Sequence, residues 1–106
     1  MRRAARADTN QPDIVKALRR GGATIWHTHT LGRGGPDIVI GYCGINILAE
    51  IKRDEREQLT LAEYKFHATW KGNIVILRGI DDAIGLLDKM RERVKKIEFC
   101  QVFTFL

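Results

Sequence analysis

The chain has two kinds of apolar pattern, one with the period of a helix and one with the period of a strand. Residues 10–20 favour a helix, because their apolar positions lie three and four apart and a Gly-Gly pair follows them. Asn10 is expected to cap this helix, and Pro12 is tolerated in its first turn. Residues 23–30 are β-branched and aromatic, which predicts a first strand.

The middle of the chain predicts two further strands, over residues 37–42 and 45–52. The loop before them, LGRGG, has three glycines in four positions and breaks the strand pattern. A second helix is expected after Thr60, because Thr60 and Glu63 have the spacing of a capping box. Its aromatic residues are predicted to pack in the core or against a partner.

The last third of the chain predicts a short buried strand over residues 73–78 and then a third helix. The inward side of that helix is expected to carry Ile84, Leu87 and Val94, together with the aliphatic part of Arg91. Residues 97–106, IEFCQVFTFL, are interpreted as an extra strand or an oligomer contact. The element order αβββαβα indicates an α/β or α+β sandwich.

Composition narrows the class of protein. The 106 residues suit one domain, which we place at residues 10–106 behind a basic arm at residues 1–9. With 44% hydrophobic and 29% charged residues the chain is typical of a globular protein, and no apolar run is long enough to span a bilayer. No secretory signal is evident, so we expect a cytoplasmic protein without membrane contact.

Positive charge favours a polyanionic partner. The net charge is +5, and a basic cluster occupies residues 89–96. Further arginines lie near the start of the chain, at Arg2, Arg3, Arg6, Arg19 and Arg20. Nucleic acid is the first candidate partner, and a solvated basic surface is the alternative.

The hairpin formed by residues 37–52 gathers charges. If Cys43-Gly44 is a two-residue turn, Asp37 lies directly opposite Glu50, with Cβ atoms about 4.5–5.5 Å apart. Lys52 lies two residues beyond Glu50 and therefore on the same face. Cysteine adopts a positive φ poorly, so a longer Gly41–Gly44 loop is an alternative, in which Glu50 is diagonal to Asp37.

Two adjacent carboxylates repel each other and stay ionised only beside a cation. Oxygen ligands of this kind suit Mg²⁺, which binds through one or two carboxylates together with water and phosphate. A metal lowers the pKa of its bound water, and the Lys52 ammonium could orient that water or neutralise developing charge. The sequence thus predicts a site for phosphodiester hydrolysis.

These residues resemble the PD-(D/E)xK nuclease superfamily, with Pro36-Asp37 as the PD element and Glu50-Ile51-Lys52 as the ExK element. The segments DTNQPDIVKALRRGGA, GRGGPDIVIG, LTLAEYKFHATWKGN and DDAIGLL look like those of small phage-type VRR-NUC nucleases, which are related to Holliday junction resolvases. The resemblance implies a restriction-endonuclease-like αβββαβ core, with a mixed sheet flanked by helices. It also implies a homodimer, encoded by a phage or prophage in a bacterial host.

The resemblance implies roles for individual residues. Asp37, Glu50 and the backbone carbonyl of Ile51 would bind Mg²⁺ or Mn²⁺, and Lys52 would assist the attacking water. Asp13 matches the position of an acidic residue on the first helix that often joins such sites. Gln58 corresponds loosely to a supporting glutamine.

Other residues carry weaker expectations. Arg33, in the LGRGG loop, is predicted to contact DNA. His27 and His29 alternate on one strand face, but no third zinc ligand is apparent, so contact with a phosphate near the cleft is favoured.

The predicted function is a Mg²⁺-dependent endonuclease that hydrolyses phosphodiester bonds in DNA. Branched or junction DNA is the expected substrate, because the chain has little material for reading bases. The alternatives are a catalytically silent DNA-binding module and a protein-interaction module on the same fold.

Overall fold

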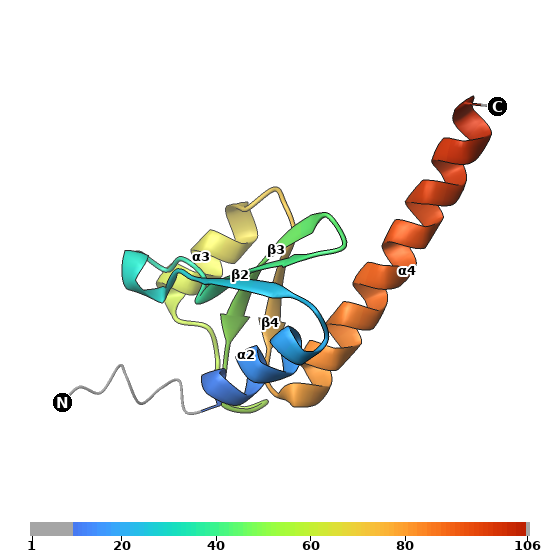
Figure 1. Cartoon of the computed structure of the whole chain (residues 1–106). Coiled ribbons are helices and arrows are strands. Elements are labelled where there is room, and N and C mark those ends of the chain that lie inside the picture. The colour runs from blue at the N-terminus through green and yellow to red at the C-terminus, as the bar shows by residue number, and fades with distance from the viewer. Residues whose placement is uncertain (1–9, 106) are drawn as a thin grey trace.

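The computed structural model describes residues 10–105, with side chains through Lys96. The predicted basic arm with Arg2, Arg3 and Arg6 lies outside the described residues. The elements, drawn in Figure 1, are α2 (Gln11–Arg20), β1 (Thr24–His27), the 3₁₀ helix η1 (His29–Leu31), β2 (Ile38–Tyr42), β3 (Ile45–Ile51), α3 (Leu61–Thr69), β4 (Ile74–Leu77) and α4 (Ile80–Phe105).

The four strands form one mixed sheet in the order β1-β2-β3-β4. The β1–β2 and β2–β3 pairs are antiparallel, and β4 is parallel to β3. A parallel neighbour needs a crossover, and α3 supplies it between β3 and β4. The predicted α/β class and the αβββαβ order are confirmed.

The β2–β3 hairpin has the shorter of the two predicted turns. Tyr42 pairs with Ile45, so Cys43 and Gly44 alone form the turn. Their φ angles are 53° and 75°, both in the left-handed region that a type I′ turn requires. Cys43 adopts this conformation although cysteine disfavours it, because the apolar faces of both strands hold this register.

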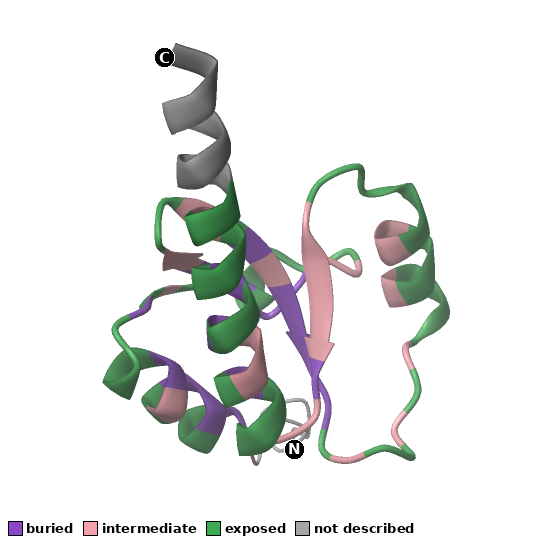
Figure 2. Ribbon diagram, turned by 90° about the vertical axis from the view of Figure 1, so that its right-hand side faces the viewer, coloured by how far each residue is buried: buried purple, intermediate pink, exposed green. Residues whose placement is uncertain are grey.

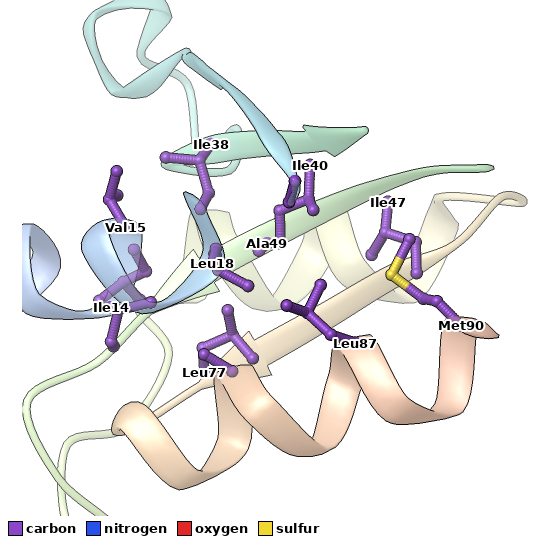
Figure 3. Packing of buried hydrophobic residues seen from close by; sticks show 13 residues of the cluster. Ile14, Val15, Leu18, Ile38, Ile40, Ile47, Ala49, Leu77, Leu87 and Met90 are labelled. Carbon is purple, nitrogen blue, oxygen red and sulfur yellow. The ribbon is translucent and has the colours of Figure 1, made fainter. Parts of the chain in front are cut away.

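The sheet separates two helical layers (Figure 2): α2 and α4 cover one face, and α3 lies across the other. The α2–α4 side holds the core, where Ile38, Ile40, Ile47 and Ala49 of the hairpin line the sheet (Figure 3). Ile51 belongs to the same cluster. Ile14 and Leu18 of α2 and Leu87 and Met90 of α4 pack against them. α3 has no buried residue.

Two predicted segments differ from the structure. β1 ends at His27, because the Thr28 backbone leaves the extended region, with a ψ of 2°, and begins the 3₁₀ helix η1. The extra strand expected over residues 97–106 is wrong, because α4 continues without a break to Phe105. No glycine or proline follows Gly85, so nothing in the sequence ends the helix earlier.

The inward stripe of α4 is also rotated from the prediction. Ala83, Leu87 and Met90 are buried, whereas Ile84 is 50% exposed. Arg91 donates to the Tyr42 hydroxyl at the surface instead of lining the core. Across residues 10–105, no helix combines the length and the apolar character needed to cross a membrane.

Candidate active site

Asp37, Glu50 and Lys52 meet at one end of the sheet, as the hairpin register predicts. Ile38 pairs with Ala49, and the Asp37 N–H donates to the Ala49 carbonyl at 3.0 Å, so Asp37 lies opposite Glu50. All three side chains are buried, with residue exposures of 9%, 3% and 4%. Burial of three ionisable groups side by side is rare for a merely structural surface cluster.

The Asp37 carboxylate is held in place by the main chain of the neighbouring strand. Its Oδ2 accepts a hydrogen bond of 2.7 Å from the Ile51 N–H. Upstream of it, the Thr28 hydroxyl donates to the Pro36 carbonyl at 2.8 Å. The carboxylate is therefore presented by a rigid strand pair and not by a mobile loop.

Glu50 is a buried carboxylate with an unused oxygen. Its Oε1 has no hydrogen-bond partner among the described residues. Burial, followed by the negative charges of Asp37 and Glu63, raises the pKa of Glu50 to about 10. Such a group either keeps a proton or receives a cation from solution.

Lys52 supplies the positive charge of the cluster. Its Nζ lies 2.7 Å from Glu63 Oε1, 3.7 Å from Glu57 Oε2 and 3.9 Å from Glu50 Oε2. Burial alone would lower the pKa of Lys52, but these carboxylates outweigh it and raise that pKa. The ammonium group therefore stays charged at neutral pH although it is buried.

Glu63 has two functions. The capping box is present as predicted: the Thr60 N–H donates to Glu63 Oε1 at 2.8 Å, and the Glu63 N–H donates to Thr60 Oγ1 at 3.2 Å. The same Oε1 accepts from Lys52. The prediction gave Glu63 a capping function only, because the sequence does not show which strand end meets the start of α3.

His67 extends the cluster by one turn of α3. Burial lowers the pKa of His67; the Lys52 charge adds to this effect, and Glu63 opposes it. Its Nε2 is buried without a hydrogen-bond partner in the described part of the chain. The sequence predicted a core or partner-facing residue, whereas the structure places this imidazole beside Lys52 and Glu63.

The start of α2 is tied to the same end of the sheet. Asn10 occupies the N-cap position, but its side chain makes no capping hydrogen bond. Instead, Asn10 Nδ2 donates to the Lys52 carbonyl at 2.8 Å. The predicted side-chain cap is thus replaced by a contact that fixes α2 against the end of β3.

Two residues expected at the site lie elsewhere. Asp13 is exposed and lines a depression between α2 and α4 with Ile84 and Asp88, so the structure does not bring it to the acid cluster. Gln58 is exposed in the segment before α3, and its neighbour Glu57 is the residue that approaches Lys52.

The predicted DNA-contacting arginines are at the surface where they are described. Arg33 is exposed, with a φ of 60°. Arg19 and Arg20 are exposed in the last turn of α2. All three side chains are therefore accessible to a macromolecular ligand.

The donor atoms fit a divalent metal. Within the described part of the chain, no three His, Cys, Asp or Glu side chains surround a common point. The predicted donor set needs only two carboxylates and a backbone carbonyl, and hard oxygen ligands of this kind suit Mg²⁺. A cation would coordinate Glu50 Oε1, which has no hydrogen-bond partner among the described residues. It would also stabilise the ionised carboxylate and so lower the raised pKa of Glu50.

Comparisons of the chain with protein-family models, curated proteins and solved structures find no match. Any inference about the function of this chain therefore rests on its own residues and their arrangement. The strongest of these are the buried acids and the lysine at the end of the sheet.

Proposed function

We propose that the chain is a metal-dependent endonuclease of the PD-(D/E)xK kind that hydrolyses DNA phosphodiester bonds. One observation carries the proposal: Asp37, Glu50 and Lys52 are buried together at one end of the sheet, and Glu50 Oε1 has no hydrogen-bond partner in the part of the chain that the structure describes. Perturbed ionisable groups gathered in this way are typical of catalytic sites.

Asp37, Glu50 and the Ile51 carbonyl would hold Mg²⁺ or Mn²⁺. When bound, the metal would polarise a phosphoryl oxygen and make a bound water more acidic. The fit is supported by the Ile51 N–H, which fixes the Asp37 carboxylate, and by the free Glu50 Oε1.

Lys52 would orient the attacking water or neutralise the charge that develops on phosphate. Its Nζ lies 3.9 Å from Glu50 Oε2 and is kept charged by Glu63. Because the ammonium is buried, its electrostatic effect is larger than it would be in water. Glu63 positions Lys52 and itself is positioned by the α3 cap.

The proposed partner is DNA, bound mainly through its phosphates. The net charge of +5 and the exposed Arg19, Arg20 and Arg33 favour salt-dependent binding without base reading. A branched substrate, a homodimer and a place in the cytoplasm of a phage-infected bacterium belong to the same proposal. A monomeric mass in solution scattering would count against the dimer.

One observation favours a second candidate, a catalytically silent DNA-binding module. Lys52 already has three carboxylate neighbours, and Glu63 is at 2.7 Å. Structural ion-pair networks also perturb pKa values in this way. Metal dependence separates the two candidates, because a silent module binds DNA equally well with and without metal.

The test is nicking of supercoiled plasmid by the purified chain in EDTA, Mg²⁺ or Mn²⁺. We expect no nicking in EDTA, nicking with either metal, and a loss of about 100-fold or more in Asp37→Asn and Lys52→Ala, which remove a metal ligand and a charge-stabilising group. Asp81→Asn is the matched control, because Asp81 is exposed at the start of α4, and it should keep wild-type activity.

Circular dichroism of each variant separates lost chemistry from lost folding. Nicking in EDTA, or full activity in Lys52→Ala, would refute the proposal. DNA binding without nicking under all conditions would identify the silent module.

A further inference from the structure

A groove with a volume of about 820 Å³ lies between α2 and the end of β1. Three exposed cationic side chains line it, Lys16, Arg19 and Arg20, and none of its lining residues in the described part of the chain is acidic. A groove with charge of one sign concentrates polyanions such as nucleic acid.

The groove also offers flat and apolar surfaces. Pro12 and Val15 of α2 line it together with His27 and His29. The two imidazole rings are exposed and stand edge to face, with centroids 6.3 Å apart and an interplanar angle of 87°. Unpaired bases stack on aromatic side chains, histidine included, whatever the base.

Gln11 adds a buried polar group that lacks a partner. It is only 6% exposed, its Nε2 lies 3.3 Å from His27 Nδ1, and its Oε1 is without a hydrogen bond among the described residues. His27 Nδ1 can satisfy only one atom of the amide, so one polar atom of the amide stays free in either orientation. A buried unsatisfied amide atom favours a ligand that pairs with it, and a base edge does so.

The groove opens at the same end of the sheet as the acid cluster. Gln11 follows Asn10, whose side chain donates to the Lys52 carbonyl. His27 pairs with Ile38, the residue after Asp37. The groove therefore lies at this end of the sheet on its α2 side, whereas the acids face the α3 side, so a bound strand would pass around the sheet end between them.

We propose that this groove seats an unpaired nucleotide of the DNA strand at the same end of the sheet as the acids. In a duplex the base faces are stacked and the pairing edges are occupied, so only an unpaired base can both contact Gln11 and stack on an imidazole. The proposal rests on the proposed endonuclease function and narrows its substrate to duplexes that carry an unpaired segment.

The test measures binding of the full chain in EDTA by fluorescence anisotropy with two labelled probes. One probe is a nicked, fully paired duplex, and the other is the same duplex with a short unpaired flap. We expect the wild type to bind the flap probe about tenfold more tightly, because one stacked base contributes about that factor. His27→Ala should lose most of this preference and keep its affinity for the nicked duplex.

Further variants separate the contributions to binding. Lys16→Ala should weaken binding of both probes, because it contacts phosphate only. Gln11→Glu should weaken binding of the flap probe, because it puts a carboxylate in an anion-binding groove. Lys71→Ala is the control, since Lys71 is exposed beyond α3 at the far end of the sheet, and it should change neither affinity.

Equal affinity of the wild type for the two probes would overturn the proposal, and so would an equal loss for both probes in His27→Ala. Because His27 is exposed, its variant should fold even if Gln11→Glu does not. Plasmid nicking distinguishes the two proposals. A flap preference without nicking would refute the endonuclease alone, whereas nicking without a flap preference would refute the groove assignment alone.

Discussion

Glu50 shows how one buried residue links stability to function. Its raised pKa means that the folded chain takes up a proton at this carboxyl, and that the ionised form opposes folding. The contribution to stability is therefore lost as pH rises from the ordinary value of 4.5 toward about 10. The charge that would hold a metal thus destabilises the metal-free protein.

We expect Glu50→Gln to be more stable than the wild type in EDTA at pH 8, by about 1–2 kcal/mol, because the folded wild type must keep a proton on this carboxyl that the unfolded chain releases. In a domain of this size that is a rise in Tm of about 4–15 °C. The difference should shrink toward pH 5, where the carboxyl, with its ordinary pKa of 4.5, also begins to bind a proton in the unfolded chain. Thermal unfolding followed by circular dichroism across this pH range measures it.

Glu57→Gln is the matched control, and it should lower Tm at pH 8, where Glu50→Gln raises it. Burial alone would raise the pKa of Glu57, but hydrogen bonds from Arg53 and the charge of Lys52 lower it overall. Its charge therefore stabilises the fold above pH 4.5 and loses that effect in acid. A Tm that falls in Glu50→Gln at pH 8 would contradict the assigned electrostatics.

At the scale of elements, the LGRGG loop packs closely against α3, the helix that carries Glu63 to the acid cluster. Gly32, Arg33 and Gly34 have consecutive positive φ angles of 73°, 60° and 78°. A Cβ on Gly34 would lie 2.5 Å from the Ala62 carbonyl oxygen in the first turn of α3. Glycine is needed there because the loop backbone packs against the helix that carries Glu63.

Gly34→Ala should destabilise the chain by about 2–3 kcal/mol, since it adds a clash to an unfavourable φ. Gly44→Ala in the β2–β3 turn is the control, because its φ of 75° is similar but no described atom lies within 4 Å of the added Cβ, and it should cost only about 1 kcal/mol. Urea unfolding measures both values. Equal losses in the two variants would show that the close approach to α3 does not matter.

At the scale of the whole molecule, α2 and α4 build the core on one face of the sheet, and the acid cluster depends on that core for its rigidity. Leu87 of α4 is 3% exposed and packs so closely on Gly21 at the end of α2 that a Cβ there would clash. Stability is therefore concentrated in the layer of α2, the sheet and α4, away from α3.

Leu87→Ala should lower the free energy of unfolding by about 2–5 kcal/mol, because it leaves a cavity between α4 and α2. Ile84→Ala is the control on the same helix and should cost less than about 1 kcal/mol, since Ile84 is 50% exposed. Guanidinium unfolding of the two variants tests the observed orientation of α4. Similar losses in the two variants would support the orientation that the sequence predicted, in which both side chains face inward.

The sequence determined the features that depend on nearby residues. The alternation of the hairpin placed Asp37 opposite Glu50 with Lys52 on the same face, and the observed register confirms this arrangement. The Thr60–Glu63 capping box was likewise predictable, because its hydrogen bonds close within four residues.

Only the tertiary structure decided which elements meet. Asn10 bonds to Lys52, Glu63 reaches Lys52, and α4 turns Leu87 and Met90 inward instead of Ile84, all through packing between segments far apart in the chain. Local patterns carry no such information, because a helix with several apolar stripes can pack on any of them until its neighbours are in place. The local pattern thus determined that Asp37 and Glu50 lie on one strand pair, and tertiary packing brought Glu63 to Lys52 beside them.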